Sequence, residues 1–291
     1  MSDLSFRIAR FLLTLLAYIP LFINHALGAL LGWLVYLGSP SYARRIRKNI
    51  QQSLIAQSSN SLHQLIQSNV AESGKTVIET FAIWFRRDKS VFNLVKACHG
   101  WEHVEIALKH GKGLIFLTPH LGCFEITSLY YGAQHPMTVL YRQPRHAWLL
   151  PLITSGRQRS GVTLAPANAT GIKQLLQTLK RGEAIGILPD QAPFEGEGVW
   201  APFFERPAYT MTLASKLAEK TGAQVFMAFG ERLSFGRGYH IHIRPIEAGG
   251  IHTPALLNAE IETTIRQCPA QYLWGYDRYK DRHQTLPANH L

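Results

Sequence analysis

Apolar residues dominate the first forty positions of the chain. No Lys, Arg, Asp or Glu occurs from Phe11 to Ala43, and residues 11–37 are mostly Leu, Ile, Phe, Ala and Val. A helix over this stretch, rising about 1.5 Å per residue, would exceed the roughly 30 Å hydrocarbon core of a bilayer. We therefore predict that residues 1–40 form one membrane-anchoring helix, tilted or kinked at Pro20. A cleavable signal peptide is the alternative, but its apolar region would be only about 7 to 15 residues long.

Helical spacing of apolar residues continues after the predicted anchor. Residues 41–56 and 61–86 show this spacing and have basic flanks, which predicts two helices lying on the bilayer surface or, equally, packing on the rest of the protein. Within the anchor, Gly28 and Gly32 form a GxxxG pattern that would suit a helix-packing face.

The pattern changes at Gly113 to short apolar runs separated by helical or loop sequence. This alternation predicts an α/β fold with a largely parallel sheet flanked by helices, behind the N-terminal membrane-anchoring helix. We expect a helix from Pro207 to about Thr221 and further helices near 254–267 and 269–280. With no repeat or linker, residues 41–291 form one catalytic domain in this interpretation. The predicted strands are GLIFLT (113–118), MTVLY (137–141), GVTLAP (161–166), AIGILP (184–189), AQVFMAFG (223–230) and GYHIHIRP (238–245).

Basic residues outnumber acidic ones, thirty to nineteen, which gives a net charge of +11 and a pI near 9.7. This surplus predicts an anionic partner, which could be nucleic acid, a membrane surface, a phosphorylated substrate or an acidic protein. The basic cluster at 44–48 (RRIRK) follows the apolar stretch, whereas only Arg7 and Arg10 precede it, so the positive-inside rule places the rest of the chain in the cytoplasm. Three widely spaced cysteines form no disulfide framework, which fits a reducing compartment.

A histidine and a glutamate follow the first predicted buried strand. The strand ends at Thr118 and Pro119 and presents His120, and Glu125 begins the next predicted helix. Ligand crevices form at such strand ends in α/β sheets. Histidine can act as a general base at neutral pH, and a nearby carboxylate can hold its tautomer. The spacing predicts an acid–base pair, although a purely structural polar pair would have the same pattern.

Further motifs are spread over nearly the whole chain, in addition to the anchor and the HLGCFE form of an HxxxxD/E motif. They are YRQPR at 141–145, RQRSGV at 157–162, LPDQAP at 188–193, WAPFF at 200–204 and PAQYLWGYDRYK at 269–280. On these motifs the chain resembles the late acyltransferases of lipid A biosynthesis, the lauroyl and myristoyl enzymes of the wider lysophospholipid acyltransferase superfamily. Residues 275–279 depart from the tail of that family, which leaves the lipid acceptor open.

The resemblance implies a reaction and roles for individual residues. His120 would take the proton of the acceptor hydroxyl, and Glu125 would orient His120. Arg157 matches a functional arginine of the family, and Asp190 lies in the matching LPDQ motif, which implies that both bind substrate; Asp190 could instead be a helix cap or a salt-bridge partner. The donor would be acyl carrier protein or, alternatively, acyl-CoA, and the acceptor a lipid A precursor. The enzyme would use no cofactor and no metal, and would sit in the bacterial inner membrane with its catalytic domain on the cytoplasmic side.

A long basic stretch supports an anionic acceptor independently of the resemblance. No Asp or Glu occurs from Ile126 to Gly182, which holds seven Lys and Arg residues. Because guanidinium groups bind two phosphate oxygens at once, we predict that Arg142, Arg145 and Arg157 bind the anionic lipid. A solvated basic face is the plainer interpretation.

Other functions are less consistent with the sequence. Acylation of a lysophospholipid or another lipid stays open. A non-catalytic, basic membrane-binding protein would not need both His120 and Glu125, and no nucleic-acid-binding signature occurs. The SGKT at 73–76 lacks the earlier glycine of a phosphate-binding loop, and no GxSxG occurs. We interpret the pairs His99/His103 and His240/His242 as surface or core histidines rather than metal ligands.

Overall fold

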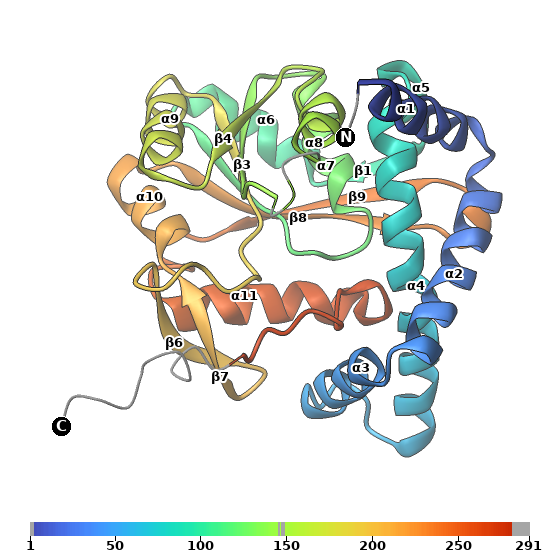
Figure 1. Ribbon diagram of the computed structural model, residues 1–291. Coiled ribbons are helices and arrows are strands. Elements are labelled where there is room, and N and C mark those ends of the chain that lie inside the picture. Colours follow the sequence, from blue (N-terminus) through green and yellow to red (C-terminus); the bar gives the residue numbers. More distant parts are fainter. Residues whose placement is uncertain (1–2, 145, 147–148, 281–291) are drawn as a thin grey trace, which may run out of the picture.

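A seven-stranded sheet forms the centre of the molecule (Figure 1). The computed structural model describes residues 3–144, 146 and 149–280 of the chain. The strand order is β1-β9-β8-β2-β5-β3-β4, and every neighbouring pair is parallel except β8 and β9. This confirms the predicted α/β class. The strands are β1 (Val95–His99), β2 (Leu114–Leu117), β3 (Met137–Tyr141), β4 (Val162–Pro166), β5 (Ala184–Ile187), β8 (Gln224–Arg232) and β9 (Tyr239–Ile246).

The two central strands β2 and β5 are completely buried and pair side by side in parallel. Alternate residues of β2 pack into different cores: Ile115 and Leu117 lie on one face of the sheet, and Leu114 and Phe116 on the other. Because Leu117 is in register with Ile187, the segments that follow β2 and β5 leave the sheet at the same edge. This edge is where the predicted site residues 120 and 190 emerge.

Helices cover both faces of the sheet. Residues of α6 and α7 belong to one core, and residues of α9, α10 and α11 belong to the core on the opposite face. The apolar spacing within these helices accounts for the burial of one side of each. The helices of this part are α5 (Asp88–Phe92), α6 (Trp101–His110), α7 (Phe124–Gly132), α8 (Leu150–Arg157), α9 (Ala169–Lys180), α10 (Leu213–Thr221) and α11 (Pro254–Gln267).

The predicted N-terminal span is divided into two helices at Pro20. Proline ends the first helix because it lacks the backbone N–H and clashes with the preceding turn. Among the described residues, α2 is the one helix long and apolar enough to cross a membrane. Two further helices confirm the predicted segments 41–56 and 61–86. The four helices are α1 (Asp3–Tyr18), α2 (Leu21–Gly38), α3 (Pro40–Gln52) and α4 (Ser59–Phe85).

The GxxxG of α2 packs within the chain, against α4. A Cβ atom on Gly28 would collide with the backbone at Lys75, and one on Gly32 would collide with the carbonyl of Val70. Gly74 on α4 faces both of these glycines, so the two backbones are in direct contact. Helix α2 is therefore attached to the globular part along its length rather than joined to it only at its end (Figure 1).

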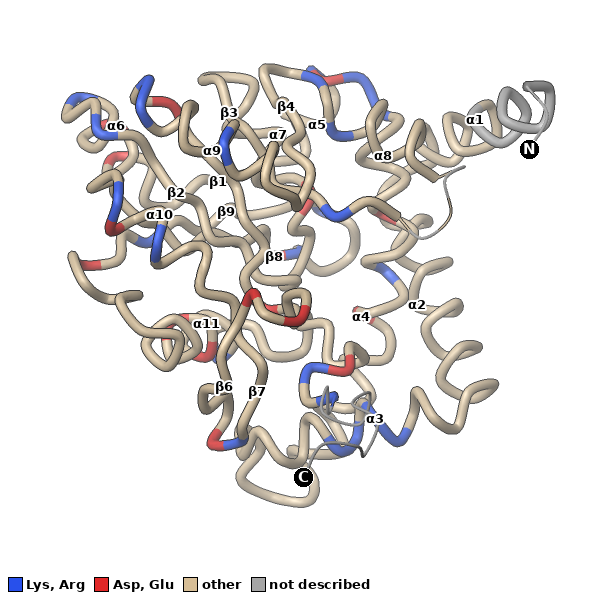
Figure 2. The backbone as a smooth tube through the Cα atoms, turned by 60° about the vertical axis from the view of Figure 1, so that its left-hand side comes forward, with Lys and Arg blue, Asp and Glu red and all other residues tan. Residues whose placement is uncertain are grey.

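The other side of α2 is exposed and apolar. Phe22, Leu27, Leu30 and Leu34 are all exposed, and the 3₁₀ turn η2 (Ser234–Gly236) adds Phe235, which is 90% exposed. Figure 2 shows no charged position along α2, whereas Lys and Arg positions follow along α3. This surface has the composition that a bilayer interface requires.

A buried charge cluster attaches α2 and α4 to the sheet. Arg232, on β8, donates through Nε to Oε2 of Glu79 at 2.8 Å and also pairs with Glu72 on α4. The Tyr239 hydroxyl donates to Glu79 at 3.0 Å, and His25 on α2 lies 3.3 Å from the same carboxylate. Burial alone would raise the pKa of Glu79, but the charge of Arg232, its hydrogen bonds and His25 outweigh this effect and lower the pKa to about 2.

Two predicted helices are wrong. Pro207 lies in a strand, in register with Pro202 in the separate hairpin of β6 (Gly198–Phe203) and β7 (Arg206–Met211), and the following helix α10 begins at Leu213. A two-stranded hairpin has two open edges, so it accommodates prolines that a central strand would not. Residues 269–280 contain only the 3₁₀ turn η3 (Pro269–Gln271) and then an irregular segment.

The irregular segment after η3 is held by side chains of helices α3 and α4. Asn69 donates to the Tyr272 carbonyl at 2.7 Å, and Asn49 donates to the Trp274 carbonyl at 2.8 Å. Arg278 is buried and donates to the Tyr209 carbonyl at 2.6 Å. The asparagine side chains therefore supply hydrogen bonds to backbone carbonyls that a helix would otherwise satisfy internally.

Candidate active site

His120 lies just beyond β2, next to the segment that follows β5. The Thr118 amide still donates to the Ile187 carbonyl at 3.0 Å, and from there the two chains turn away from the sheet together. Asp190, in the second segment, contacts His120 twice. Its Oδ1 is 2.8 Å from Nδ1 of the ring, and its Oδ2 accepts the backbone N–H of His120 at 3.0 Å. The adjacency of β2 and β5 therefore fixes both the backbone and the ring of His120.

The electrostatics favour one tautomer of His120. Asp190 is only 2% exposed. Burial would raise its pKa, but the charge and hydrogen bonds of His120 outweigh burial and lower the pKa, so the carboxylate is ionised at neutral pH. An ionised partner keeps the proton on Nδ1 and leaves the lone pair on Nε2. The amide of Gln191 lies 3.2 Å from Nε2 and marks the position in which a hydrogen-bonding substrate group would sit.

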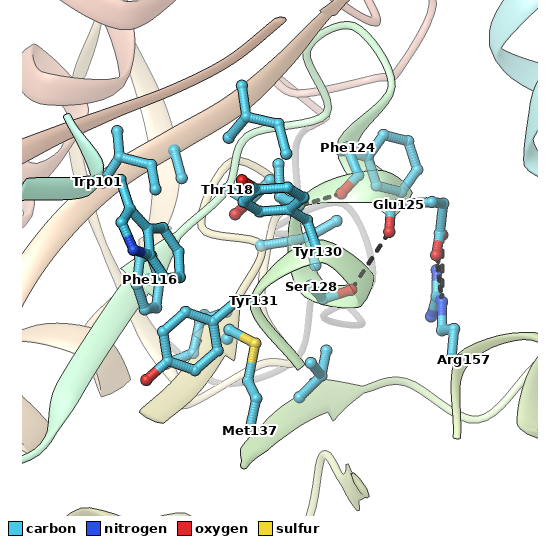
Figure 3. Close-up of a pocket in the computed structure, with 18 residues that line it drawn as sticks. Trp101, Phe116, Thr118, Phe124, Glu125, Ser128, Tyr130, Tyr131, Met137 and Arg157 are labelled. Carbon is cyan, nitrogen blue, oxygen red and sulfur yellow. Dashed lines mark hydrogen bonds and ion pairs between the residues drawn. The ribbon is translucent and has the colours of Figure 1, made fainter. Parts of the chain in front are cut away.

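Glu125 has different partners from the one predicted. Its carboxylate accepts hydrogen bonds from Nε and Nη2 of Arg157, including one of 2.9 Å from Nε (Figure 3). It also accepts one of 3.0 Å from the indole of Trp84. Among the described residues, the carboxylate hydrogen-bonded to His120 is that of Asp190, and the orienting role expected of Glu125 stays a prediction. The guanidinium of Arg157, which we expected to hold phosphate, uses one of its edges for this buried carboxylate.

The loop between His120 and Glu125 depends on a close approach to β8. Gly122 has φ +60°, and a Cβ atom there would collide with the Gly230 carbonyl. That carbonyl accepts the Cys123 amide at 2.7 Å, and the Gly122 amide donates to the Gln271 carbonyl at 3.0 Å. Only glycine combines this backbone conformation with this contact.

Two pockets near the candidate site differ greatly in size. A small, largely apolar cavity of about 30 Å³ lies between α7 and the sheet and includes Thr118, Phe124 and Glu125 in its lining (Figure 3). A wider groove of about 490 Å³ is lined by apolar side chains of β3, α9 and α10, with Lys216 and Lys220 among its basic groups. The small cavity has room for about one water molecule, whereas the groove is in the size range of ligand sites.

The groove contains one of the predicted basic residues. Arg142 lies in its wall, with the guanidinium 4.3 Å from the centre of the Phe194 ring and 3.3 Å from the Ala192 carbonyl. The same 190–194 segment thus carries Asp190 at the histidine and Phe194 in the groove. Arg145 lies outside the described residues.

The structure adds Gln191 and Trp84 to the residues that the sequence predicts at the site. Gln191 stands inside the LPDQ motif, so its position next to Asp190 was visible in the sequence. Trp84 comes from α4, forty-one residues before Glu125. No local pattern marks it, because only the packing of α4 against α7 brings the two together.

Comparison with known proteins identifies the family. The family model of the bacterial lipid A biosynthesis acyltransferases matches residues 5–281. The chain belongs to this family. It is 25% identical over 284 residues to the lipid A biosynthesis lauroyltransferase of Escherichia coli (strain K12), covering 96% of this chain and 92% of that protein.

Other members show a similar degree of likeness. The chain is 27% identical over 242 residues to the lipid A biosynthesis palmitoleoyltransferase of the same strain, covering 81% of this chain and 78% of that protein. A lipid A biosynthesis acyltransferase of Haemophilus influenzae is 27% identical over 270 residues, covering 91% and 84% of the two chains. This member of the lipid A biosynthesis acyltransferases is therefore an acyl-transferring enzyme, and the contacts of His120 can be considered in terms of that reaction.

Proposed function

We propose that this acyltransferase moves a fatty acyl group from an acyl carrier protein thioester to a hydroxyl of a lipid A precursor, with His120 as the general base and Asp190 as its orienting partner. The observation that carries the proposal is the pairing of Nδ1 of His120 with the buried Asp190 carboxylate at 2.8 Å. It leaves Nε2, which lies beside the Gln191 amide, available to act as the base.

The reaction needs no group beyond the two substrates and the protein. Nε2 of His120 takes the hydroxyl proton as the acceptor oxygen attacks the thioester carbonyl. The tetrahedral intermediate collapses, the carbon–sulfur bond breaks, and the imidazolium returns its proton to the leaving thiolate. Ionised Asp190 stabilises the imidazolium during these steps because it lies against Nδ1 and is shielded from water. Bound acceptor takes the place of the Gln191 amide at Nε2.

The groove beside the 190–194 segment supports an amphiphilic, anionic substrate. Its floor is apolar and its volume of about 490 Å³ suits an alkyl chain. Arg142, Lys216 and Lys220 place positive charge around it. We propose that one acyl chain of the acceptor lies in this groove with its phosphate near these side chains. Glu125 and Arg157 hold α7 and α8 together beside the histidine. We propose that the exposed apolar side of α2 contacts the bacterial inner membrane and that the site faces the cytoplasm, which the apolar composition of this side supports.

The test is an acylation assay with purified protein, acyl carrier protein carrying a defined chain, and a lipid A precursor, analysed by mass spectrometry. His120→Asn and Asp190→Asn should each lower kcat by about 10² to 10⁴ with melting temperatures close to that of the unmodified enzyme.

Matched reactions separate the alternatives. Acyl-CoA replaces the acyl carrier protein in one series, and a lysophospholipid replaces the lipid A precursor in another. Gln191→Ala is the control, because it changes a side chain next to the His120 ring without changing the base or its carboxylate. It should retain activity within about tenfold, since it removes only a hydrogen bond that the acceptor displaces. Near-normal turnover in folded His120→Asn would overturn the mechanism. Transfer only to the lysophospholipid would overturn the proposal that the acceptor is a lipid A precursor.

A further inference from the structure

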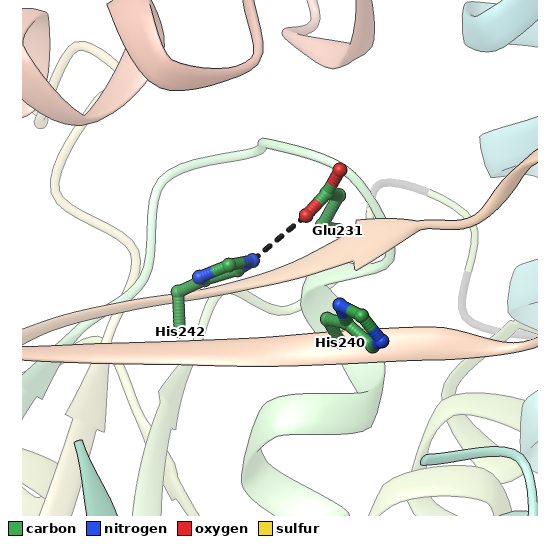
Figure 4. A group of neighbouring side chains, drawn as sticks. All are labelled: Glu231, His240 and His242. Carbon is green, nitrogen blue, oxygen red and sulfur yellow. Dashed lines mark hydrogen bonds and ion pairs between the residues drawn. The ribbon is translucent and has the colours of Figure 1, made fainter. Parts of the chain in front are cut away.

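A cluster of histidines and a carboxylate lies on the sheet face away from α7. His240 and His242 are two apart on β9 and therefore share a face, and Glu231 on β8 is in register with His240. Figure 4 shows the Glu231 carboxylate turned toward the ring of His242, whose Nε2 is 2.8 Å from Oε2. One donor atom from each of the three residues lies within 4.8 Å of the other two.

We propose that Glu231, His240 and His242 form a binding site for a divalent transition metal ion of the zinc type. Imidazole nitrogens and a carboxylate oxygen are donors that Zn²⁺ accepts, and two histidines with one glutamate leave coordination positions for water. Donors of a tetrahedral zinc ion lie about 3.4 Å apart, given bond lengths of about 2.0 to 2.2 Å. The distance from Nε2 of His242 to Oε2 of Glu231 is 2.8 Å, and no donor atom is more than 4.8 Å from another, so small side-chain rotations would bring all three to a common ion.

The scaffold and the surroundings support this proposal. All three residues lie on paired antiparallel strands, which hold ligands more firmly than loops do. A third histidine, His99 on the edge strand β1, stacks on His242 with ring centres 5.0 Å apart and lies 5.3 Å from the ring of His240. The side chains of His242 and Glu231 are 30% and 36% exposed, so an ion can enter from solvent.

The sequence alone suggested that His240 and His242 were ordinary histidines, because a pair without a third donor is a weak signal. The register of β8 with β9 supplies that donor. Glu231 also follows Gly230 directly, and the Gly230 carbonyl accepts the Cys123 amide in the loop between His120 and Glu125. An ion at this site therefore restrains the end of β8 on which that loop rests, and it should raise the melting temperature.

The experiment uses the full-length protein in detergent, freed of any purification tag and carrying His283→Ala and His290→Ala, so that histidines outside the described residues do not contribute. ZnCl₂ is titrated by calorimetry, and CoCl₂ is titrated with visible absorption to report the coordination geometry. We expect one ion per chain, a cobalt spectrum of low coordination number, and a higher melting temperature with either metal.

The variants locate the site. His242→Ala and Glu231→Gln should each weaken zinc binding by at least about 100-fold, since loss of an outer-shell partner alone costs about 10- to 100-fold in metal sites. His63→Ala removes an exposed histidine whose Nδ1 bonds only the Ser59 carbonyl of its own helix, and it should bind like the parent protein. Glu231→Gln keeps the side-chain size, so a folded protein is available even if a histidine variant unfolds. Absence of saturable binding to the folded parent, or unchanged one-to-one binding in both site variants, would overturn the proposal.

Discussion

Replacing Arg232 by methionine should test how strongly the buried charge cluster holds the N-terminal helices to the sheet. The side chains of Arg232 and Glu79 are each 1% exposed, so methionine leaves a buried carboxylate without its cation. The fall in the pKa of Glu79 from 4.5 to about 2 corresponds to about 3 kcal/mol at 1.36 kcal/mol per pKa unit. Breaking a buried ion pair costs about 3 to 5 kcal/mol, so the two routes agree.

The dependence of this loss on pH identifies its cause. Because the pKa of Glu79 is lowered in the folded state, its contribution is complete above pH 4.5 and disappears as the pH falls toward 2. In Arg232→Met the buried carboxylate instead gains a proton easily in acid. The difference in stability between the parent and the variant should therefore be about 3 to 5 kcal/mol at pH 7 and should shrink below pH 5.

The assay is guanidinium unfolding in detergent, followed by circular dichroism at pH 7, 5 and 4. The control is Arg237→Met, which removes an exposed arginine that bonds only the nearby Ser234 carbonyl and should change stability by less than about 0.5 kcal/mol. A loss under about 1 kcal/mol at pH 7 for Arg232→Met, or a loss that stays constant in acid, would refute the reasoning.

Three further predictions concern the remaining contacts. Gly32→Ala should lower stability by about 1 to 3 kcal/mol because its methyl group meets the α4 backbone, whereas Gly38→Ala, with open space around it, should change the melting temperature little. Arg157→Lys should lose nearly as much stability and acylation rate as Arg157→Ala, since an ammonium cannot bridge both oxygens of Glu125; full activity with lysine would contradict this. Phe235→Asp should weaken binding to anionic liposomes by about ten- to a hundred-fold in flotation assays without altering the melting temperature, and unchanged flotation would remove Phe235 from the membrane contact.

Local patterns predicted six of the seven strands of the sheet and missed the edge strand β1. Runs such as residues 113–118 and 184–189 are apolar throughout because β2 and β5 are buried on both faces, and that composition is visible without any tertiary information. The helix predicted from Pro207 was wrong because the local sequence fits two kinds of element. Proline is common at the first turn of helices and at open strand edges, and only the pairing of Pro207 with Pro202 decides between them.

The partners in the candidate site could not be predicted in the same way. His120 was found from its place at a strand end, but its carboxylate partner depends on strand order. Asp190 follows β5, which lies beside β2 although β3 and β4 come between them in the chain. Glu125, five residues away, was the nearer carboxylate in sequence, and its pairing with Arg157 becomes apparent only once α7 and α8 are packed.

The buried cluster around Glu79 also sets the order in which the protein can be completed during synthesis. Arg232 follows Glu79 by 153 residues, so at about 5 to 20 residues per second its counter-charge emerges roughly 8 to 30 s later. Before Arg232 is made, packing α4 into its final position would bury the Glu79 carboxylate without its arginine. The cost of burying this charge disfavours that packing. The N-terminal helices are made first but can dock only after β8 arrives. A nascent chain that stops short of β8 therefore keeps this carboxylate in water, and these helices dock only on a chain that has been translated through Arg232.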